Sequence, residues 1–304
     1  MSFRVIKSGF MSTIQDAGRF GLAHYGVSQS GVADEQAASW ANHLLANHFN
    51  AAVIEITLGH FECVALDDAD IVITGADLNF TLNGKRIAMW QQSHIVKGDK
   101  IHCSGPQKGQ GIRAYIAVKG GFNTESLFNS RSVNVREHIG QALHEGDILD
   151  SVVTMSKRLK RSTPTFFRPD YSAPLVLRFM PSYQYEFFTP QQVDTLLNQT
   201  YLMHSASDRT GCRLDGQAVA EVPPNMISEG IAYGSIEVTT AGQPIILLKD
   251  RPTIGGYPKI GTVFSLDLAK LAQRQPGIEI TFKLMMLDEA QRLRQQFNTF
   301  FGIK

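Results

Sequence analysis

The chain of 304 residues contains little cysteine and no long apolar run. Its three cysteines, Cys63, Cys103 and Cys212, are odd in number, widely separated and without zinc-site spacing, which predicts packed, reduced thiols. The longest apolar stretches, such as residues 244–248, are far shorter than the roughly 20 residues that a transmembrane helix needs. The N-terminus shows no basic region followed by an apolar core and a cleavage site. We therefore expect a cytoplasmic protein that has no membrane as a partner.

An excess of either charge is also missing, because the formal net charge is +1. Binding to nucleic acid normally requires a basic face, so we expect no nucleic-acid partner. The length allows two domains or one large one with a substantial core.

The usual nucleotide, metal and acyl-transfer motifs are absent as well. No Gly-x4-Gly-Lys-Ser/Thr loop occurs, and the Gly-x-Gly of residues 109–114 leads into a strand-like segment where a dinucleotide site needs a helix. His43 and His48 are five residues apart and do not share one helical face, so we expect no metal site. The segment at 26–30 ends in Ser30 where a nucleophile elbow requires glycine. A reaction that consumes ATP would therefore need another protein to bind the nucleotide.

Short strands, glycine turns and few helices characterise what is present, and this pattern predicts a mainly β sandwich or barrel. The clearest hairpin signal is Asn83–Gly84. The predicted strands cover residues 53–58, 71–74, 79–82, 86–89, 112–118, 175–180, 235–239, 244–249 and 277–285. The predicted helices cover residues 34–47, 190–198 and 288–297. A basic, proline-containing segment at 151–174 predicts a linker between a first half, 1–150, and a second half, 175–304.

The stretch LLKDRPTIGGYPKIG at 247–261 places charges and glycines directly after the apolar strand Ile245–Leu248. One interpretation is a tight hairpin with solvated charges; the other is a loop whose backbone approaches a ligand or a second chain. Gly255 and Gly256 permit unusual backbone angles and close approach. We expect the side chains of Tyr257 and Lys259 to be exposed because they follow these glycines.

Three long stretches carry a family resemblance over nearly the whole chain. They are TIQDAGRFGLAHYGVSQSGVADEQAASWANHLLANHFNAAVIEITLG at 13–59, SASDRTGCRLDG at 205–216 and SEGIAYGSIEVTTAGQPIILLKDRPTIGGYPKIG at 228–261. Together they resemble the biotin-dependent carboxyltransferase family, also described as allophanate hydrolase subunit 2 proteins. The sequence departs from the family pattern at Phe20, in the Glu237–Thr240 segment, at Pro252 and at Pro181–Tyr183.

The resemblance implies two cyclophilin-like β-barrel halves with a few short helices. It also implies the C subunit of a bacterial ATP-dependent 5-oxoprolinase, working with a B-type subunit and a lactam-opening A subunit on a small-molecule substrate. The chain itself would bind no cofactor, and the complex would use ATP. One alternative is a urea-carboxylase or allophanate-type carboxyltransferase component that uses biotin; another is a regulatory binding protein that antagonises a kinase inhibitor.

Under this resemblance the 249–259 loop becomes part of the site. The residues assigned to catalysis are Glu229, Tyr257 and Lys259, and those assigned to substrate binding are Arg209, Arg213, Lys249, Asp250, Arg251, Thr253, Gly255 and Gly256. A guanidinium fork suits a small anionic substrate, although Arg209 could equally fix a loop through an ion pair. Glu229 could act as an acid or base, or bond to the amides of a turn. Residues that fit a turn or a partner interface equally well are Gln15, Asp16, Arg19, Gly31 and Asp34, and for Glu55, inside an apolar run, we favour a structural ion pair.

Overall fold

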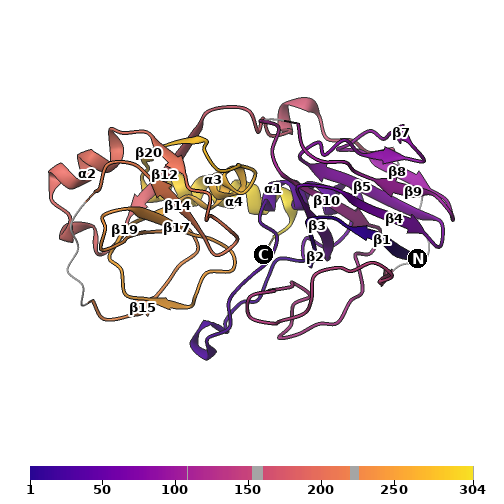
Figure 1. The fold of residues 1–304 in the computed structure, drawn as a ribbon, viewed down its shortest axis with the longest axis horizontal. Coiled ribbons are helices and arrows are strands. Elements are labelled where there is room, and N and C mark those ends of the chain that lie inside the picture. Colours follow the sequence, from indigo (N-terminus) through magenta and orange to yellow (C-terminus); the bar gives the residue numbers. More distant parts are fainter. Residues whose placement is uncertain (108, 153–159, 220–225, 304) are drawn as a thin grey trace. The chain divides into compact units, whose positions relative to one another are not determined.

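The computed structural model describes residues 1–107, 109–152, 160–219 and 226–303 (Figure 1). The chain divides into two compact units. The first contains Met1–Arg19, Ser30–Ser172 and Phe301–Lys304, and the second contains Phe20–Gln29 and Ala173–Phe300. This division differs from the expected one in three places. Residues 20–29 belong to the second unit, and the end of the chain from Phe301 belongs to the first. The expected linker, of which 153–159 lie outside the described residues, belongs to the first unit from 160 to 172.

The first unit is built from two antiparallel sheets. The six-stranded sheet has the order β11 (Ile148–Asp150), β1 (Ser2–Ser8), β4 (Phe61–Ala65), β9 (Lys100–His102), β6 (Thr81–Leu82) and β7 (Lys85–Arg86). The five-stranded sheet has the order β2 (Met11–Gln15), β3 (Val53–Thr57), β10 (Arg113–Val118), β5 (Ala69–Gly75) and β8 (Gln92–Ile95). The Asn83–Gly84 hairpin is confirmed, since it joins β6 to β7 with positive φ at both residues.

The five-stranded sheet is covered on both faces, and its sequence shows why. On β3, Ile54 and Ile56 enter the core formed with the six-stranded sheet, whereas Val53 packs on the other face against helix α1 (Glu35–Leu44). Alternate strand residues point to opposite faces, so both sets must be buried here. Every residue of β5 is buried for the same reason.

The second unit is a closed seven-stranded barrel. Its order is β12 (Leu175–Pro181), β19 (Lys259–Val263), β16 (Ser235–Val238), β17 (Pro244–Leu247), β14 (Gly211–Asp215), β13 (Tyr201–Met203) and β20 (Glu279–Leu284). A separate two-stranded ribbon consists of β15 (Glu229–Gly230) and β18 (Ile254–Gly255). The barrel interior is filled by alternate residues of each strand, for example Leu177 and Phe179 of β12. The predicted mainly β architecture with a few short helices is confirmed.

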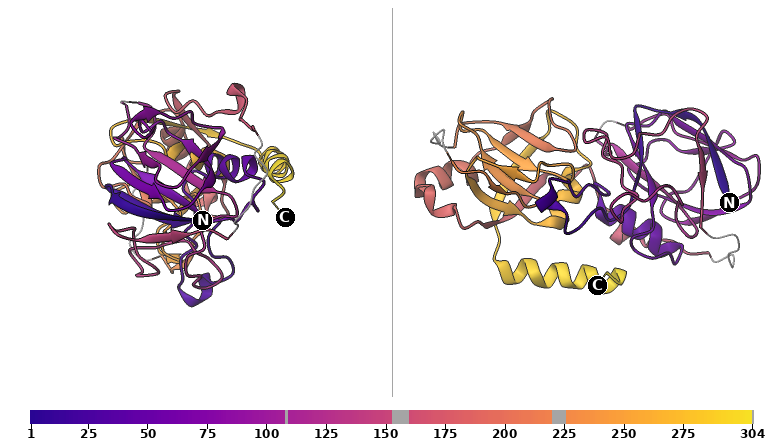
Figure 2. Two further views of the ribbon diagram at one scale, coloured as in Figure 1. Left: turned by 90° about the vertical axis from the view of Figure 1, so that its right-hand side faces the viewer. Right: turned by 90° about the horizontal axis from the view of Figure 1, so that it is seen from below.

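Helices α2 (Pro190–Leu197), α3 (Ser265–Leu271) and α4 (Leu287–Phe301) belong to the second part of the chain (Figure 2). The predicted start of α2 is confirmed: Thr189 is its N-cap, Gln192 completes a capping box and Pro190 occupies the first turn. The sequence pattern did not predict α3, which has only seven residues and no side-chain cap. The described residues also include 3₁₀ turns at Ala23–Tyr25 (η1), Thr165–Phe167 (η2) and Tyr185–Phe187 (η3).

All three cysteines are free thiols buried in the two cores, as predicted. Burial raises the pKa of Cys103 and of Cys212 to about 12, which keeps both protonated. Because the thiolate is the reactive form, these cysteines act as packing residues.

Asp34 allows the contribution of a helix cap to the stability of the first unit to be measured. Its carboxylate accepts a hydrogen bond from the Ala37 amide at 3.0 Å, as the N-cap of α1, and another from the Tyr171 hydroxyl at 2.7 Å. We predict that Asp34→Ala lowers the free energy of unfolding by about 2 kcal/mol, at the upper end of N-cap effects. Thr189→Ala at the exposed cap of α2 is the matched control and should cost about 0.5–1 kcal/mol. Urea unfolding measures both; equal losses would contradict the prediction.

Candidate functional site

The candidate site lies on the outer face of the second barrel, where β16 pairs with β19. After a register shift between Ile236 and Glu237, Glu237 and Lys259 are direct partners across these antiparallel strands, which places their side chains on the same face. Both residues are only 5% exposed. The expectation that Lys259 would be exposed is therefore wrong. Lys259 is the first residue of β19 and is buried, whereas Tyr257, two residues earlier, is 39% exposed.

Gln184 ties the cluster together from the loop that precedes η3. Its amide nitrogen donates to the Glu229 carboxylate at 3.0 Å, and its amide oxygen accepts from the Lys259 backbone N–H at 2.7 Å. The Lys259 ammonium lies 3.6 Å from the same carboxylate oxygen of Glu229. The hydroxyl of Ser182 donates to the Lys259 carbonyl. The sequence around Gln184 does not indicate that its side chain bonds to residues 45 and 75 positions away, so the sequence did not predict its role in this cluster.

Glu229 and Lys259 therefore form an ion pair with one end inside the protein and the other open to solvent. The Lys259 side chain is 6% exposed and that of Glu229 is 39% exposed. A carboxylate beside a buried ammonium can exchange a proton with a ligand while the ammonium polarises a carbonyl oxygen. The structure thus brings together two of the three residues assigned to catalysis and places Tyr257 two residues from Lys259.

Glu237 is the second carboxyl group in this cluster. Its Oε1 atom is buried and has no hydrogen-bond partner among the residues that the structure describes. Burial raises the pKa of Glu237, and the neighbouring Lys259 charge opposes this only in part. An ionised carboxylate in such surroundings is costly, so this residue holds its proton to higher pH than an ordinary glutamate.

The glycines at positions 255 and 256 are explained by the limited space beside their backbone rather than by unusual backbone angles. Neither has positive φ, so that part of the expectation is wrong. A Cβ atom on Gly255 would lie 2.6 Å from Ile231 Cδ1 and 2.8 Å from Glu237 Oε1. At Gly256 the nearest atom is the Met226 carbonyl oxygen at 3.3 Å. The expected close approach therefore occurs at Gly255, and the approaching groups are the side chains of Ile231 and Glu237.

The charges of the loop that follows β17 are largely buried, which rules out a hairpin with solvated charges. Lys249 is 6% exposed, and its ammonium lies 4.4 Å from the centroid of the Tyr233 ring, a cation–π contact. The Arg251 guanidinium donates to the carbonyls of Ile231 and Leu248 and to the Gln29 side chain. Burial lowers the pKa of Arg251. Arg251 therefore stabilises the conformation of this loop by donating hydrogen bonds to its backbone and to Ile231.

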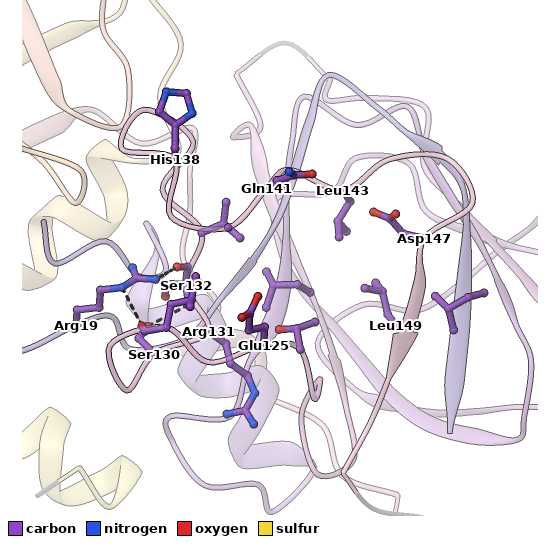
Figure 3. A pocket seen from close by; sticks show the side chains of 16 residues that line it. Arg19, Glu125, Ser130, Arg131, Ser132, His138, Gln141, Leu143, Asp147 and Leu149 are labelled. Atoms are coloured by element: carbon purple, nitrogen blue, oxygen red, sulfur yellow. Dashed lines mark hydrogen bonds between the residues drawn. The ribbon is translucent and has the colours of Figure 1, made fainter. Parts of the chain in front are cut away.

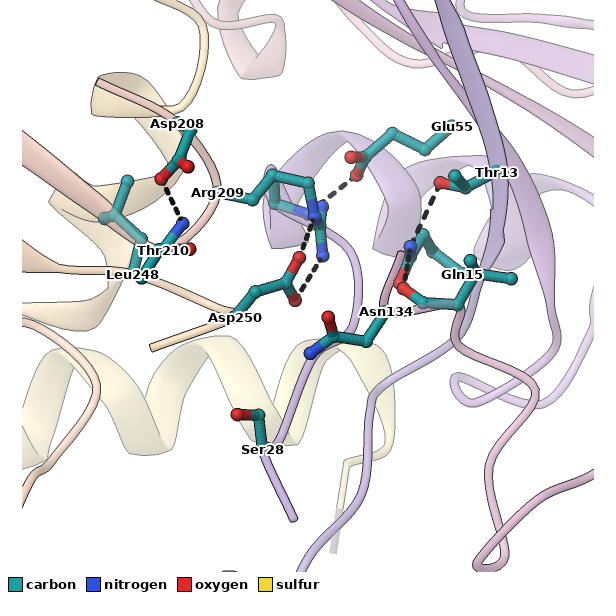
Figure 4. A network of polar contacts seen from close by, with 12 residues as sticks. Thr13, Gln15, Ser28, Glu55, Asn134, Asp208, Arg209, Thr210, Leu248 and Asp250 are labelled. Carbon is teal, nitrogen blue, oxygen red and sulfur yellow. Dashed lines mark hydrogen bonds and ion pairs between the residues drawn. The ribbon is translucent and has the colours of Figure 1, made fainter. Parts of the chain in front are cut away.

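Arg209 is occupied by an ion pair within the second unit. Its guanidinium donates two hydrogen bonds to the Asp250 carboxylate, at 2.7 and 3.1 Å (Figure 4). The Thr253 carbonyl accepts from the Ile231 amide at 3.0 Å, so it also supports the ribbon. Arg213 is exposed on β14 between the core residues Cys212 and Leu214. Among these residues, only the Arg209–Asp250 pair has the geometry of the loop-fixing ion pair considered above.

The residues assigned to a turn or an interface in the first unit hold loops. The Asp16 carboxylate accepts hydrogen bonds from the hydroxyls of Ser130 and Ser132, both at 2.6 Å, and from the Arg131 and Gly18 amides. Gln15 donates to the Thr13 hydroxyl, as Figure 4 shows, and to the Val133 carbonyl. The remaining members also serve local structure: Arg19 donates to the Ser132 carbonyl, Asp34 caps α1, and Gly31, at φ 101°, leaves no space for a Cβ atom beside the Ala17 carbonyl.

Glu55 is a buried carboxylate with internal partners. It accepts from the Tyr115 hydroxyl at 2.9 Å and from the Ala33 amide at 2.8 Å, and Arg113 lies 3.9 Å away. The prediction of a structural ion pair is therefore confirmed.

A cavity of about 480 Å³ lies beside the Asp16 loop in the first unit. Figure 3 shows Arg19 with Ser130 and Ser132 at one end and Asp147 with Leu149 at the other. Its walls mix apolar side chains with residues of both signs of charge. No group of three His, Cys, Asp or Glu side chains among the described residues could hold a metal ion. Within the same residues, no helix combines the length and the apolar character required to cross a membrane.

Comparison with known proteins places this arrangement in a family. The model of the carboxyltransferase domain, subdomains A and B, matches residues 25–284, so the chain belongs to that family. It is 34% identical to the C subunit of 5-oxoprolinase from Haemophilus influenzae, over 94% of this chain and 92% of the relative. The corresponding figures for the 5-oxoprolinase C subunit of Escherichia coli are 30%, 98% and 96%.

Larger proteins contain the same fold as one part. The chain is 30% identical to a putative urea carboxylase of Emericella nidulans, over 98% of this chain but 25% of the relative. The solved structure of the K. lactis urea amidolyase superposes with a TM-score of 0.90 at 24% identity, covering 100% of this chain and 20% of that one. At this identity the likeness shows the fold alone.

The raised pKa of Glu237 predicts a pH-dependent stability. A group with a higher pKa in the folded state contributes stability below its unfolded pKa, and this contribution is lost as pH rises through its folded pKa. Glu237→Gln removes the effect, so the free energy of unfolding of the variant minus that of the wild type should increase as pH rises from about 4, the unfolded value for glutamate. A tenfold difference in proton affinity corresponds to about 1.4 kcal/mol.

Thermal unfolding from pH 4 to pH 8 measures this difference. Glu279→Gln, at an exposed glutamate of β20, controls for the change in net charge and should show a smaller trend. A flat difference for Glu237→Gln over this range would contradict the assignment.

Proposed function

We propose that the chain is the C subunit of an ATP-dependent 5-oxoprolinase, which opens 5-oxo-L-proline to L-glutamate together with A and B subunits. The observation that carries the proposal is the buried Lys259 ammonium beside the half-exposed Glu229 carboxylate, with Gln184 bonded to both residues. Two relatives that are named as the C subunit of 5-oxoprolinase match over almost their whole length, which supports the same assignment.

In this proposal Lys259 and Glu229 divide the work on the lactam. Opening the ring by water places negative charge on the carbonyl oxygen, and a preorganised ammonium stabilises that charge in a site shielded from solvent. Glu229 is close enough to the same site to accept or deliver the accompanying proton. Tyr257, partly exposed two residues before Lys259, would supply a further hydrogen bond.

The binding of ATP belongs to a partner in this scheme. A five-membered lactam is resonance-stabilised and its hydrolysis is unfavourable, so its opening is coupled to ATP. The sequence contains no Gly-x4-Gly-Lys-Ser/Thr loop that could bind the nucleotide. We infer that the A and B subunits supply the nucleotide site and the remaining catalytic groups, and that the complex works in the cytoplasm without a cofactor bound to this chain.

A second candidate is carboxyl transfer as in a urea carboxylase, which the similarity to the Emericella nidulans protein favours. That reaction requires a biotinylated carrier, and the Met-Lys-Met acceptor sequence is absent from the chain. ATP-dependent release of glutamate from 5-oxoproline, without added biotin carrier, separates the two candidates.

Lys259→Met tests the role of the ammonium in the assembled complex. We predict a fall in turnover of about 10²–10³-fold, the usual effect of removing one charge-stabilising donor. Tyr257→Phe should cause a smaller loss, because it removes one neutral hydrogen bond. The assay is glutamate release, with melting temperature measured on the same preparations because Lys259 is buried. Lys270→Met, at a half-exposed lysine on α3, is the control; full turnover in Lys259→Met would refute the assignment.

The division of labour between subunits gives a further prediction. Titration of the isolated chain with ATP in a calorimeter should give no measurable binding, and the isolated chain should release no glutamate from 5-oxoproline. Coexpression with the A and B subunits should restore the activity and yield a complex that copurifies. A micromolar dissociation constant for ATP on the chain alone would overturn this division.

A further inference from the structure

Glu237 is a buried carboxyl group that the proposed chemistry leaves unused. Its neighbours along β16, Ile236 and Val238, are fully buried in the barrel core, so Glu237 lies on the outer face of the strand. That face is nevertheless covered by Gly255 of β18. If Gly255 carried a Cβ atom, that atom would lie only 2.8 Å from Glu237 Oε1. The carboxyl group is thus enclosed between the barrel wall and the β15–β18 ribbon.

This position is unfavourable unless a cation compensates it. Oε1 has no hydrogen-bond partner among the described residues, whereas most buried polar atoms have one. The residue directly opposite on β19 is Lys259, whose charge partly offsets the effect of burial on Glu237. On β17 the opposite residue is Ile245, which carries no charge.

Lys259 therefore has carboxylates on two sides that differ in their access to solvent. Glu229 approaches from β15 and forms the 3.6 Å ion pair, with 39% of its side chain exposed. Glu237 approaches from β16 and is 5% exposed. Two uncharged residues also belong to the cluster: Gln184 bonds to the Lys259 backbone, and Gly255 covers Glu237. Glu237 thus lies on the buried side of Lys259, whereas Glu229 lies on the side open to solvent.

We propose that Glu237 is a positioning residue that acts through Lys259, keeping its ammonium charged and in place while Glu229 exchanges a proton with the ligand. A buried ammonium that lost its sole carboxylate partner would tend to lose its proton, because burial disfavours the charged form. At a pH above the raised pKa of Glu237, its carboxylate is charged behind Lys259, so Glu229 can become neutral during the reaction without discharging Lys259. The proposal deepens the proposed function and rests on it for the identity of the ligand.

Competitive labelling of lysines in the isolated, full-length chain tests the proposal without substrate. Trace acetic anhydride reacts with neutral amines, and peptide mass spectrometry gives the labelling of Lys259 relative to Lys270, which is half-exposed on α3. In Glu237→Gln, which keeps the side-chain shape, we expect this ratio to rise about tenfold or more at pH 8, because a nearby opposite charge favours the charged form of a buried group by about that factor. Glu229→Gln should raise it less, since its carboxylate is better solvated.

An unchanged ratio in Glu237→Gln would overturn the proposal. A ratio that rises in Glu229→Gln alone would also overturn it, because the outer carboxylate would then be the only counter-ion. Melting temperatures and the absolute labelling of Lys270 show whether the variants are folded. Failure of the proposed function would appear separately, as absence of glutamate release by the wild-type complex while the labelling result stands.

Discussion

The antiparallel pairing of β16 with β19 is the constraint on which the site depends. The register shifts between Ile236 and Glu237, and this irregularity sets Glu237 opposite Lys259. The inward-facing neighbours of Glu237, Ile236 and Val238, fix which way the Glu237 side chain points. A slip of one residue would turn these charges into the barrel core, so the hydrophobic pattern that stabilises the barrel also orients the site. Gln184, in a separate loop, then holds Lys259 and Glu229 in place by a hydrogen bond to each.

The cover over this face is as important as the face itself. The β15–β18 ribbon approaches closely because Gly255 has no side chain, and Arg251 holds the adjoining loop by donating to backbone carbonyls. Removal of water strengthens the interaction between the charges beneath the ribbon. The same enclosure leaves one oxygen of Glu237 without a hydrogen bond from the part of the chain that the structure describes. Enclosure and an unsatisfied group are thus two consequences of one arrangement.

Buried carboxylates elsewhere in the chain show what a purely structural role looks like. Asp16 accepts bonds from two hydroxyls and two backbone amides, and Asp34 accepts from the Ala37 amide and the Tyr171 hydroxyl. Glu55 receives the Tyr115 hydroxyl and the Ala33 amide. Each of these groups has several donors, as the cost of burying a charge requires. Glu237 departs from this pattern, and it does so directly opposite the buried Lys259.

The sequence by itself determined the local structure and the family. Alternating apolar residues, the Asn83–Gly84 turn and the Thr189–Pro190 helix start depend on neighbouring residues, and the structure reproduces each of them. The long motifs likewise placed the chain among the carboxyltransferase domains. Only tertiary structure decided that Lys259 is buried, that Gln184 joins it to Glu229 and that Glu237 lies behind both. These contacts join residues up to 75 positions apart, so they follow from strand register and barrel closure, which no short stretch of sequence encodes.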